Sequence, residues 1–158
     1  MKPNIGISEG NRKSVAFLLN VLLADEYILY TKTRNYHWNV TGPHFQEYHK
    51  FFEAQYEVLD DFIDDVAERV RSLGEKSVAT LSEFLKHARL KEHPGEFPPS
   101  KEMIGNLIKD HELVIQNLRE GLKACGDTYQ DAGTNDFLTG LMEQHEKMAW
   151  MLRSLSEE

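Results

Sequence analysis

A run of metal-ligand side chains between Tyr36 and Arg69 constrains this chain more than any other feature of its sequence. Within one expected helix, His49 and Glu53 are four residues apart, and so are Asp64 and Glu68, so each pair lies on one helix face. The two pairs are three turns apart, which places them on one stripe but separates them by about 16 Å. A single metal ion therefore cannot use both pairs from one chain.

The spacing of these four residues is symmetric. If two copies of the helix lie antiparallel about a two-fold axis between residues 58 and 59, His49 of one chain faces Glu68 of the other, and Glu53 faces Asp64. A two-fold interface is self-complementary in this way, because residue i meets residue j and j meets i. The spacing predicts two identical sites per dimer, each with ligands from both chains.

His37 is a candidate fifth ligand. It lies near the end of the preceding helix, and Gly42-Pro43 then favours a turn and a new helix, since proline suits a first helical turn. The alternative is that the acidic residues form only a solvated helix face. The same helix also carries a set of apolar residues, which favours a packed element with a functional edge; these are Phe51, Phe52, Tyr56, Leu59, Phe62 and Ile63.

This stretch resembles the signature of the Dps family, the ferritin-like mini-ferritins named as DNA-protecting proteins of starved cells. The resemblance is carried by the segment His37-Trp38-Asn39-Val40-Thr41-Gly42-Pro43, by Phe45, His49, Phe52-Glu53, Tyr56, Asp64 and Ala67-Glu68-Arg69, and by the stretches 22–26, 31–36 and 145–152. It covers nearly the whole chain.

The resemblance implies a subunit of a dodecameric shell with tetrahedral symmetry, which oxidises ferrous iron and stores the ferric mineral, protecting against oxidative stress. In the family, the ferroxidase site at the two-fold axis uses the ligands that correspond here to His37, His49, Glu53, Asp64 and Glu68. The implied substrate and cofactor metal is iron, and the implied oxidant is hydrogen peroxide in preference to dioxygen.

Length and composition are consistent with a single cytoplasmic domain. The chain has 158 residues, 41% of them hydrophobic, with a net charge of −8 and one cysteine, Cys125. One cysteine excludes an intrachain disulfide, and the negative charge favours cations over nucleic acid as ligands. No signal peptide and no apolar run long enough to span a membrane is visible.

Periodicity predicts an all-α, ferritin-like four-helix bundle. A flexible tail is expected over residues 1–10, followed by helices over about 11–38 with Asn11 as N-cap, and from Gly42-Pro43 to about residue 73. A capping box predicts a short helix over 81–87 in the connection to the third helix. The third helix should start at a Ser100 cap and end at Gly126, and the fourth carries residues 137–155. One long crossover is the ferritin-like arrangement.

No Glu-x-x-His motif occurs in the chain, so the usual di-iron site inside one four-helix subunit is not expected. His111 and His145 fall on the apolar stripes of the third and fourth helices. We interpret them as core histidines hydrogen-bonded to neighbours rather than as an internal metal site, because no carboxylate follows either at four residues. Trp38, Tyr48 and Trp150 are candidates for quenching radicals near the iron, a role that the family resemblance suggests.

The termini argue against DNA binding. Some relatives bind DNA through a lysine-rich tail, and this mode needs several phosphate contacts. Here the only cations near the N-terminus are Lys2, Arg12 and Lys13, and the C-terminus is acidic. A DNA-binding nucleoid protein and a purely structural helical bundle remain alternatives to the ferroxidase.

The polar stretch before the last helix is the expected iron pore. In Dps relatives the corresponding segment lines channels on the three-fold axes, and the matching acidic residues here are Asp127, Asp131 and Asp136, with Asp136 the best match. The alternative is that Asp136 only stabilises the N-terminus of a helix, where negative charge is favourable.

Overall fold

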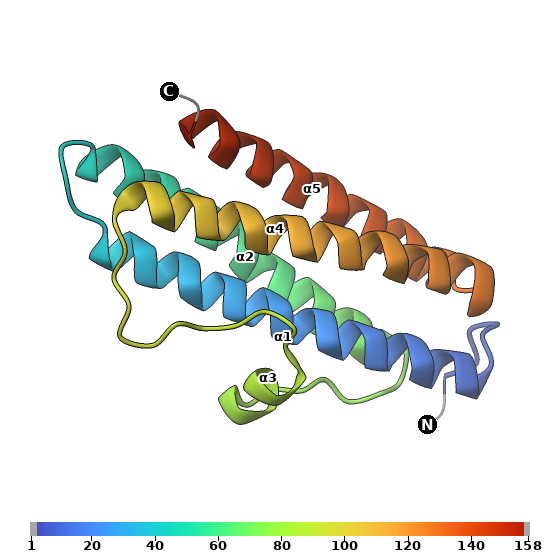
Figure 1. Cartoon of the computed structure of the whole chain (residues 1–158). Helices are drawn as coiled ribbons and strands as arrows, with labels where there is room; N and C mark the ends of the chain where they lie inside the picture. Colours follow the sequence, from blue (N-terminus) through green and yellow to red (C-terminus); the bar gives the residue numbers. More distant parts are fainter. Residues whose placement is uncertain (1–2, 157–158) are drawn as a thin grey trace.

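The computed structural model describes residues 3–156 and is built from helices packed side by side (Figure 1). The elements in chain order are α1 (Glu9–Asn39), α2 (Phe45–Ser72), α3 (Leu81–His87), α4 (Ser100–Lys123), the short π-helical turn η1 (Ala124–Thr128) and α5 (Ala132–Ser156). The four long helices form the bundle, and α3 is the short helix expected in the crossover.

The four-helix bundle consists of two antiparallel pairs. Helix α1 packs along α2, α4 packs along α5, and α3 lies on α1. Figure 1 shows that α4 begins at the same end of the bundle as α2, so the two run in the same direction and the connection must cross the length of the molecule. This confirms the expected ferritin-like topology with one long crossover.

The core is formed by the apolar stripes that the sequence predicted. Leu19 of α1, Phe52 and Leu59 of α2, Leu107 of α4 and Leu138 of α5 are fully buried. Truncating one such leucine to alanine typically costs about 2–5 kcal/mol. This packing fixes the rotation of α2, and it leaves the carboxylates of that helix on the outside.

The starts of two helices differ from those expected. Helix α1 begins at Glu9, and Ser8 is its N-cap, because its hydroxyl oxygen accepts a hydrogen bond from the Asn11 main-chain nitrogen at 3.2 Å. Asn11 instead donates from its side chain to the Tyr129 carbonyl. Ser100 is already inside α4, whose preceding residue, Pro99, makes no side-chain cap. The first and third expected helices were therefore assigned the wrong capping residue.

The N-terminal segment is partly built into the fold. Helix α1 starts inside the stretch assigned to a flexible tail, and Ile7 packs against the core. The buried Arg12 guanidinium donates to the Ile7 carbonyl at 2.8 Å. Met1 and Lys2, which belong to the same expected tail, lie outside the described residues.

The other end of the third helix also differs. Gly126 does not stop α4; the helix passes at Ala124 into the wider turn η1, which contains this glycine. The chain then turns at Gln130, which has a φ of 56°. In contrast, the short helix α3 has the expected bounds and a complete capping box between Thr80 and Glu83.

Helix α1 is the most buried long element of the bundle. Its length and composition pass a test for membrane-spanning helices, with a mean hydropathy of 1.3 over the best window, but 56% of that window is buried inside the fold. Core helices of water-soluble proteins pass the same test, so this helix is accounted for by its packing against α2 and α4.

Candidate metal centre

The turn between α1 and α2 brings His37 and His49 face to face. Their rings are stacked, with centroids 3.7 Å apart and planes inclined by 20°. Each ring is tied to the main chain of the other residue: Nδ1 of His37 lies 2.7 Å from the His49 carbonyl oxygen, and Nδ1 of His49 lies 2.7 Å from the His37 carbonyl oxygen. The two helices are thus joined by a reciprocal pair of side-chain hydrogen bonds.

This reciprocal arrangement fixes the tautomer of both rings. A carbonyl oxygen only accepts, so each Nδ1 must carry the hydrogen and donate it. In a neutral imidazole the lone pair is then on Nε2. A histidine whose Nδ1–H is held by a carbonyl and whose Nε2 is free is the usual form of a metal-ligating histidine.

Local structure accounts for the meeting of the two rings. Helix α1 ends at Asn39, and Val40 has an extended backbone. Gly42 has a φ of 116°, a backbone conformation that residues with a side chain rarely adopt. Helix α2 can therefore restart at Phe45 and run back along α1. Both rings also contact aromatic neighbours. The ring centres of Phe45 and His49 are 5.1 Å apart, and the Tyr56 ring packs edge-on against His37 with ring centres 5.2 Å apart.

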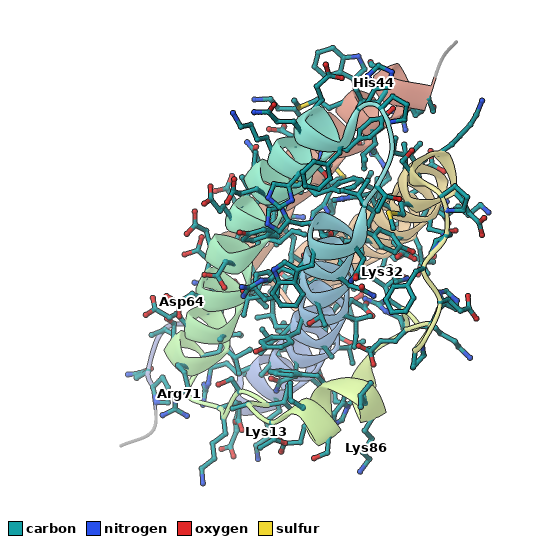
Figure 2. All side chains as sticks on the ribbon, turned by 90° about the vertical axis from the view of Figure 1, so that its left-hand side faces the viewer. Lys13, Lys32, His44, Asp64, Arg71 and Lys86 are labelled. Atoms are coloured by element: carbon teal, nitrogen blue, oxygen red, sulfur yellow. The ribbon has the colours of Figure 1, made fainter. Side chains whose placement is uncertain are left out.

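One chain holds only part of the expected ligand set in one place. Glu53, one turn beyond His49 along α2, is half-buried. Asp64 and Glu68 are exposed further along α2, and Figure 2 shows Asp64 projecting away from the bundle. Within residues 3–156, no cluster of three or more histidine, cysteine or acidic side chains has the geometry to hold a metal ion. The single chain thus presents two separate groups of ligands.

The outer edge of α2 is strongly acidic. Its exposed carboxylates are Glu57, Asp60, Asp61, Asp64, Asp65 and Glu68. None of them is among the ion pairs formed within the described part of the chain. Unpaired carboxylates on one face give a negative potential that attracts cations.

Comparison with known proteins agrees with this architecture. Residues 17–158 match the model of the ferritin-like domain. The chain is 37% identical to DNA protection during starvation protein 2 of Bacillus anthracis, an alignment that covers 90% of this chain and 96% of that protein. A crystal structure of a Dps protein from Vibrio cholerae O1 superposes with a TM-score of 0.93 at 31% identity, covering 99% of this chain and 97% of that one. The chain belongs to the Dps family.

Among other relatives, this Dps-family chain is 51% identical over 154 residues to an uncharacterized low temperature-induced protein of Nostoc sp. strain PCC 7120. That alignment covers 98% of this chain and 86% of the relative. The Vibrio cholerae protein is described as a member of a broad superfamily of ferritin-like diiron-carboxylate proteins. Membership therefore implies a ferritin-like protein of an iron-binding superfamily.

An aromatic cluster borders the histidine pair. The Arg34 guanidinium lies 5.0 Å from the Trp38 ring centre, 5.1 Å from that of Tyr56 and 5.4 Å from that of Tyr30, and it donates to the Tyr30 hydroxyl at 2.6 Å. Tyr56 links this cluster to His37. Trp38 was expected near the iron from the sequence, whereas Tyr56 and Arg34 belong to the residues that carry the family resemblance but were given no role at the site. Their spacing carried the signal, since Tyr56 is three residues after Glu53 and Arg34 is three before His37.

The two other aromatic candidates lie elsewhere. Tyr48 stacks near Phe52 and contacts His44 rather than the histidine pair. Trp150, on α5, is 59% exposed, and none of the ring contacts described for residues 3–156 joins it to His37 or His49. Of the three, Trp38 is the one that the fold places next to the ligands.

The three expected pore residues have different environments. Asp127 in η1 and Asp136 in the first turns of α5 are exposed. Asp131 is only 2% exposed, and its carboxylate accepts hydrogen bonds from the Thr134 main-chain nitrogen and hydroxyl and from Arg69. Asp131 is thus the N-terminal cap of α5 and has no free carboxylate to line a channel. Asp127 and Asp136 remain the pore candidates.

His111 and His145 are core residues, as the sequence predicted. Both are fully buried, their Nδ1 atoms are 3.0 Å apart, and His145 also bonds to Glu26 of α1. The structure therefore pairs them with each other and with the Glu26 carboxylate of α1.

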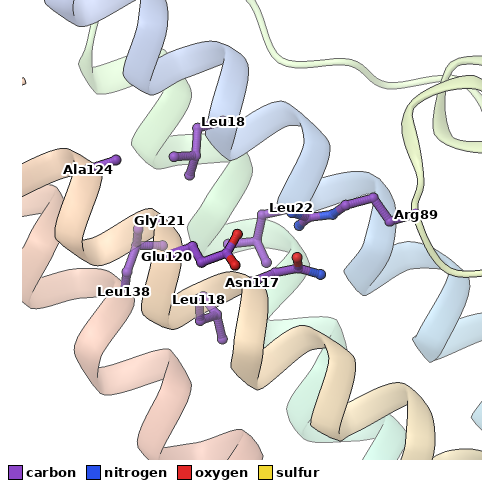
Figure 3. Close-up of a pocket in the computed structure, with 9 residues that line it drawn as sticks. All are labelled: Leu18, Leu22, Arg89, Asn117, Leu118, Glu120, Gly121, Ala124 and Leu138. Carbon is purple, nitrogen blue, oxygen red and sulfur yellow. The ribbon is translucent and has the colours of Figure 1, made fainter.

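A surface cavity of about 210 Å³ lies between α1 and α4 (Figure 3). Its polar residues are Arg89, Asn117 and Glu120, and leucines form most of the remaining wall. Arg89 is already bound to the buried Asp25 carboxylate. None of the five expected metal ligands lines this cavity, so it is separate from the metal centre.

Proposed function

We propose that this chain is a mini-ferritin subunit that oxidises ferrous iron at sites shared between two chains and stores the ferric product inside a shell. The observation that carries the proposal is the reciprocal hydrogen bonding of His37 and His49, which leaves both Nε2 lone pairs free. Imidazole and carboxylate ligands suit iron, and we assign the half-buried Glu53, one turn beyond His49, to the same half of the site.

The second half of the site comes from a neighbouring copy. Asp64 and Glu68 are exposed and unpaired in the described residues, as a pair that completes a partner's site must be. The symmetric spacing of the four α2 ligands pairs each half with the other across a two-fold axis. The assembly that the family resemblance implies is a dodecamer in the cytoplasm, with this dimer as its repeating contact.

The reaction is a two-electron reduction of hydrogen peroxide. Two ferrous ions each give one electron, the O–O bond breaks, and two protons are taken up, so that 2 Fe²⁺ + H₂O₂ + 2 H⁺ gives 2 Fe³⁺ + 2 H₂O. Taking both electrons from iron at one site avoids release of a hydroxyl radical. The candidate carboxylates on which ferric iron can nucleate are Glu53, Glu57, Asp60 and Asp61 of α2.

DNA binding is not part of this proposal. The Arg12 side chain is buried and bonded to a carbonyl, and Lys13 forms an ion pair with Glu9 at 2.9 Å. Lys2 lies outside the described residues. A gel shift across a salt series separates this proposal from the nucleoid-protein alternative, because phosphate-based binding falls steeply with salt.

The decisive experiment mixes two inactive variants. Each protein is loaded with ferrous iron without oxygen, peroxide is added, and oxidation is measured by absorbance. His49→Ala and Asp64→Ala should each lose most of this oxidation. Native mass should show that both variants form the same assembly as wild type. When the two variants are dissociated, mixed equally and reassembled, activity should return to about a quarter of wild type, because half of the dimers are hybrids and each hybrid has one intact site in two.

The matched control is Asp65→Ala, which removes an exposed carboxylate next to Asp64 from the same helix. Alone, this variant should oxidise ferrous iron at the wild-type rate. When it is reassembled with His49→Ala, the activity of the mixture should be proportional to the fraction of Asp65→Ala chains. Reassembled His49→Ala and Asp64→Ala hybrids that stay as inactive as their parents would refute the shared site. Absence of ferrous binding by the wild-type protein would instead favour a purely structural bundle.

A further inference from the structure

Three ionisable side chains meet in the middle of the bundle, apart from the metal ligands. They are Glu26 of α1, His111 of α4 and His145 of α5, and each has a relative exposure of 0%. Charged groups are almost never fully buried unless they are paired, because burial removes their hydration. The free energy of burying these three groups therefore depends on how they are paired with one another.

The three side chains form one hydrogen-bonded row. Nε2 of His145 lies 2.9 Å from Oε1 of Glu26, and Nδ1 of His145 lies 3.0 Å from Nδ1 of His111. At the two ends, Oε2 of Glu26 and Nε2 of His111 are buried and have no hydrogen-bond partner among residues 3–156. His145 is thus held between a carboxylate and a second imidazole.

The facing Nδ1 atoms limit how many protons the row can hold. Two nitrogens 3.0 Å apart form a hydrogen bond only if one donates and the other accepts. With one imidazolium, His145 donates from Nε2 to Glu26 and from Nδ1 to His111, and the carboxylate balances its charge. If His111 is protonated as well, both Nδ1 atoms are donors. The hydrogen bond is then lost, and two cations face each other at a site that is not exposed to solvent.

We propose that Glu26, His145 and His111 form a pH switch of subunit stability, which accommodates one imidazolium and excludes the second, so that acid loosens the bundle from its centre.

Within residues 3–156, no hydrogen bond or ion pair brings a second carboxylate to His111. Helix α2 faces the cluster with the Phe62 ring, 5.4 Å from His145. The neighbouring acids along α1 and α4 are engaged elsewhere: Asp25 pairs with Arg89, and Asp110 pairs with Lys32 at 2.6 Å. The carboxylate of Glu26 is therefore the counter-charge for the cluster, and it balances one proton.

The expected direction of the pH dependence follows from proton counting. Burial, and then the charge of His145, lower the pKa of His111 well below its ordinary value of 6.5. In the unfolded chain this histidine takes up a proton near pH 6.5, so the unfolded state binds more protons below that pH. Stability from this group is complete above about pH 6.5 and falls as the pH decreases further.

The test is the pH dependence of unfolding for wild type and His111→Asn. Asparagine can bond at the Nδ1 position but does not titrate. Urea unfolding of the assembled protein is measured at one fixed protein concentration from about pH 8 to about pH 5. Below about pH 6.5, the ratio of folded to unfolded protein should fall more steeply for wild type than for the variant. The difference should be about a factor of ten per pH unit. His44→Asn is the matched control, since His44 is exposed and paired with Glu47, and it should keep the wild-type slope.

A second variant keeps the test decisive if His111→Asn does not fold. Glu26→Gln can still accept from His145 but no longer balances an imidazolium, so both rings must stay neutral in the folded state. Below about pH 6.5, the folded-to-unfolded ratio of this variant should therefore fall more steeply than that of wild type, by about a further factor of ten per pH unit. Parallel pH profiles for wild type and His111→Asn, or for wild type and Glu26→Gln, would overturn the proposal.

Discussion

At the scale of single residues, spacing predicted which side chains can be ligands but not how they are held. His37 and His49 were identified from the sequence, whereas their bonds to each other's carbonyls depend on the turn at Gly42, whose path no helical periodicity specifies. Tyr56 was missed for a related reason: an aromatic residue on an amphipathic helix is usually core, and only the fold shows its ring against His37.

Asp131 and Asp136 illustrate the same limit. The family resemblance suggested a pore role for both, with helix capping as the alternative for Asp136. A carboxylate that caps a helix by accepting from the main chain three residues ahead cannot be told from a channel carboxylate until the helix start is known. Thr134 donates to Asp131 from both its main chain and its hydroxyl, at 2.9 and 2.6 Å.

Asp131→Ala should therefore reduce the free energy of unfolding by about 2–3 kcal/mol, because it removes a helix cap and leaves the partly buried Arg69 without its partner. Urea unfolding measured at pH 7 checks this value. Asp136→Asn, which alters an exposed carboxylate in the same helix, should cost less than about 1 kcal/mol. Equal losses for the two variants would mean that the cap contributes little.

At the scale of elements, the predictions succeeded where a local signal coincides with a boundary. Helix α3 has the expected bounds because the Thr80–Glu83 capping box is specified within four residues. The end of α4 was misplaced because glycine usually terminates a helix, while here Gly126 lies within the wider turn η1 that continues α4. Segment 88–99 has no periodic signal, and its path depends on contacts distant in sequence.

The crossover is anchored by one buried carboxylate. Asp25 of α1 is fully buried and accepts hydrogen bonds from the Arg89 main chain at 2.6 Å, from the Arg89 side chain at 2.7 Å and from the Leu90 main chain at 3.1 Å. These bonds fix the point at which the chain leaves α3 and turns along the bundle.

Asp25→Ala should thus cost about 3 kcal/mol, because it leaves two main-chain N–H groups of the crossover without an acceptor. Hydrogen exchange should become faster first at residues 89 and 90. The control is Glu112→Ala, which breaks the exposed pair with Arg153 and should cost less than about 1 kcal/mol. Unchanged exchange at residue 90 in the Asp25 variant would show that the crossover is held by other contacts.

At the scale of the whole molecule, the distribution of negative charge determines where cations are attracted. The net charge is −8, and the outer edge of α2 carries a row of exposed acids. The bundle itself follows from four apolar stripes and one long connection, which is why the fold was predictable from the sequence. The two-fold contact rests on a symmetry of spacing, and the number of subunits on family resemblance.

A closed shell of such subunits needs a path for ferrous ions. Asp136 is exposed at the start of α5, and none of the side-chain hydrogen bonds or ion pairs formed within residues 3–156 involves its carboxylate. If three copies surround a three-fold axis, as we propose, their negative potentials add and raise the local concentration of ferrous ions. Such steering increases a rate rather than an affinity, and it weakens as salt screens the charges.

Asp136→Asn should consequently slow iron uptake into assembled shells several-fold at about 10 mM salt, where the screening length is about 30 Å, and much less at about 1 M salt, where it is about 3 Å. Uptake is followed by absorbance after addition of ferrous iron and peroxide, with native mass confirming intact assembly. The ligand set is untouched by this change, so oxidation by shells preloaded with iron should match wild type. Uptake at the wild-type rate across the whole salt series would mean that Asp136 only stabilises the N-terminus of α5, and that iron reaches the cavity by another path.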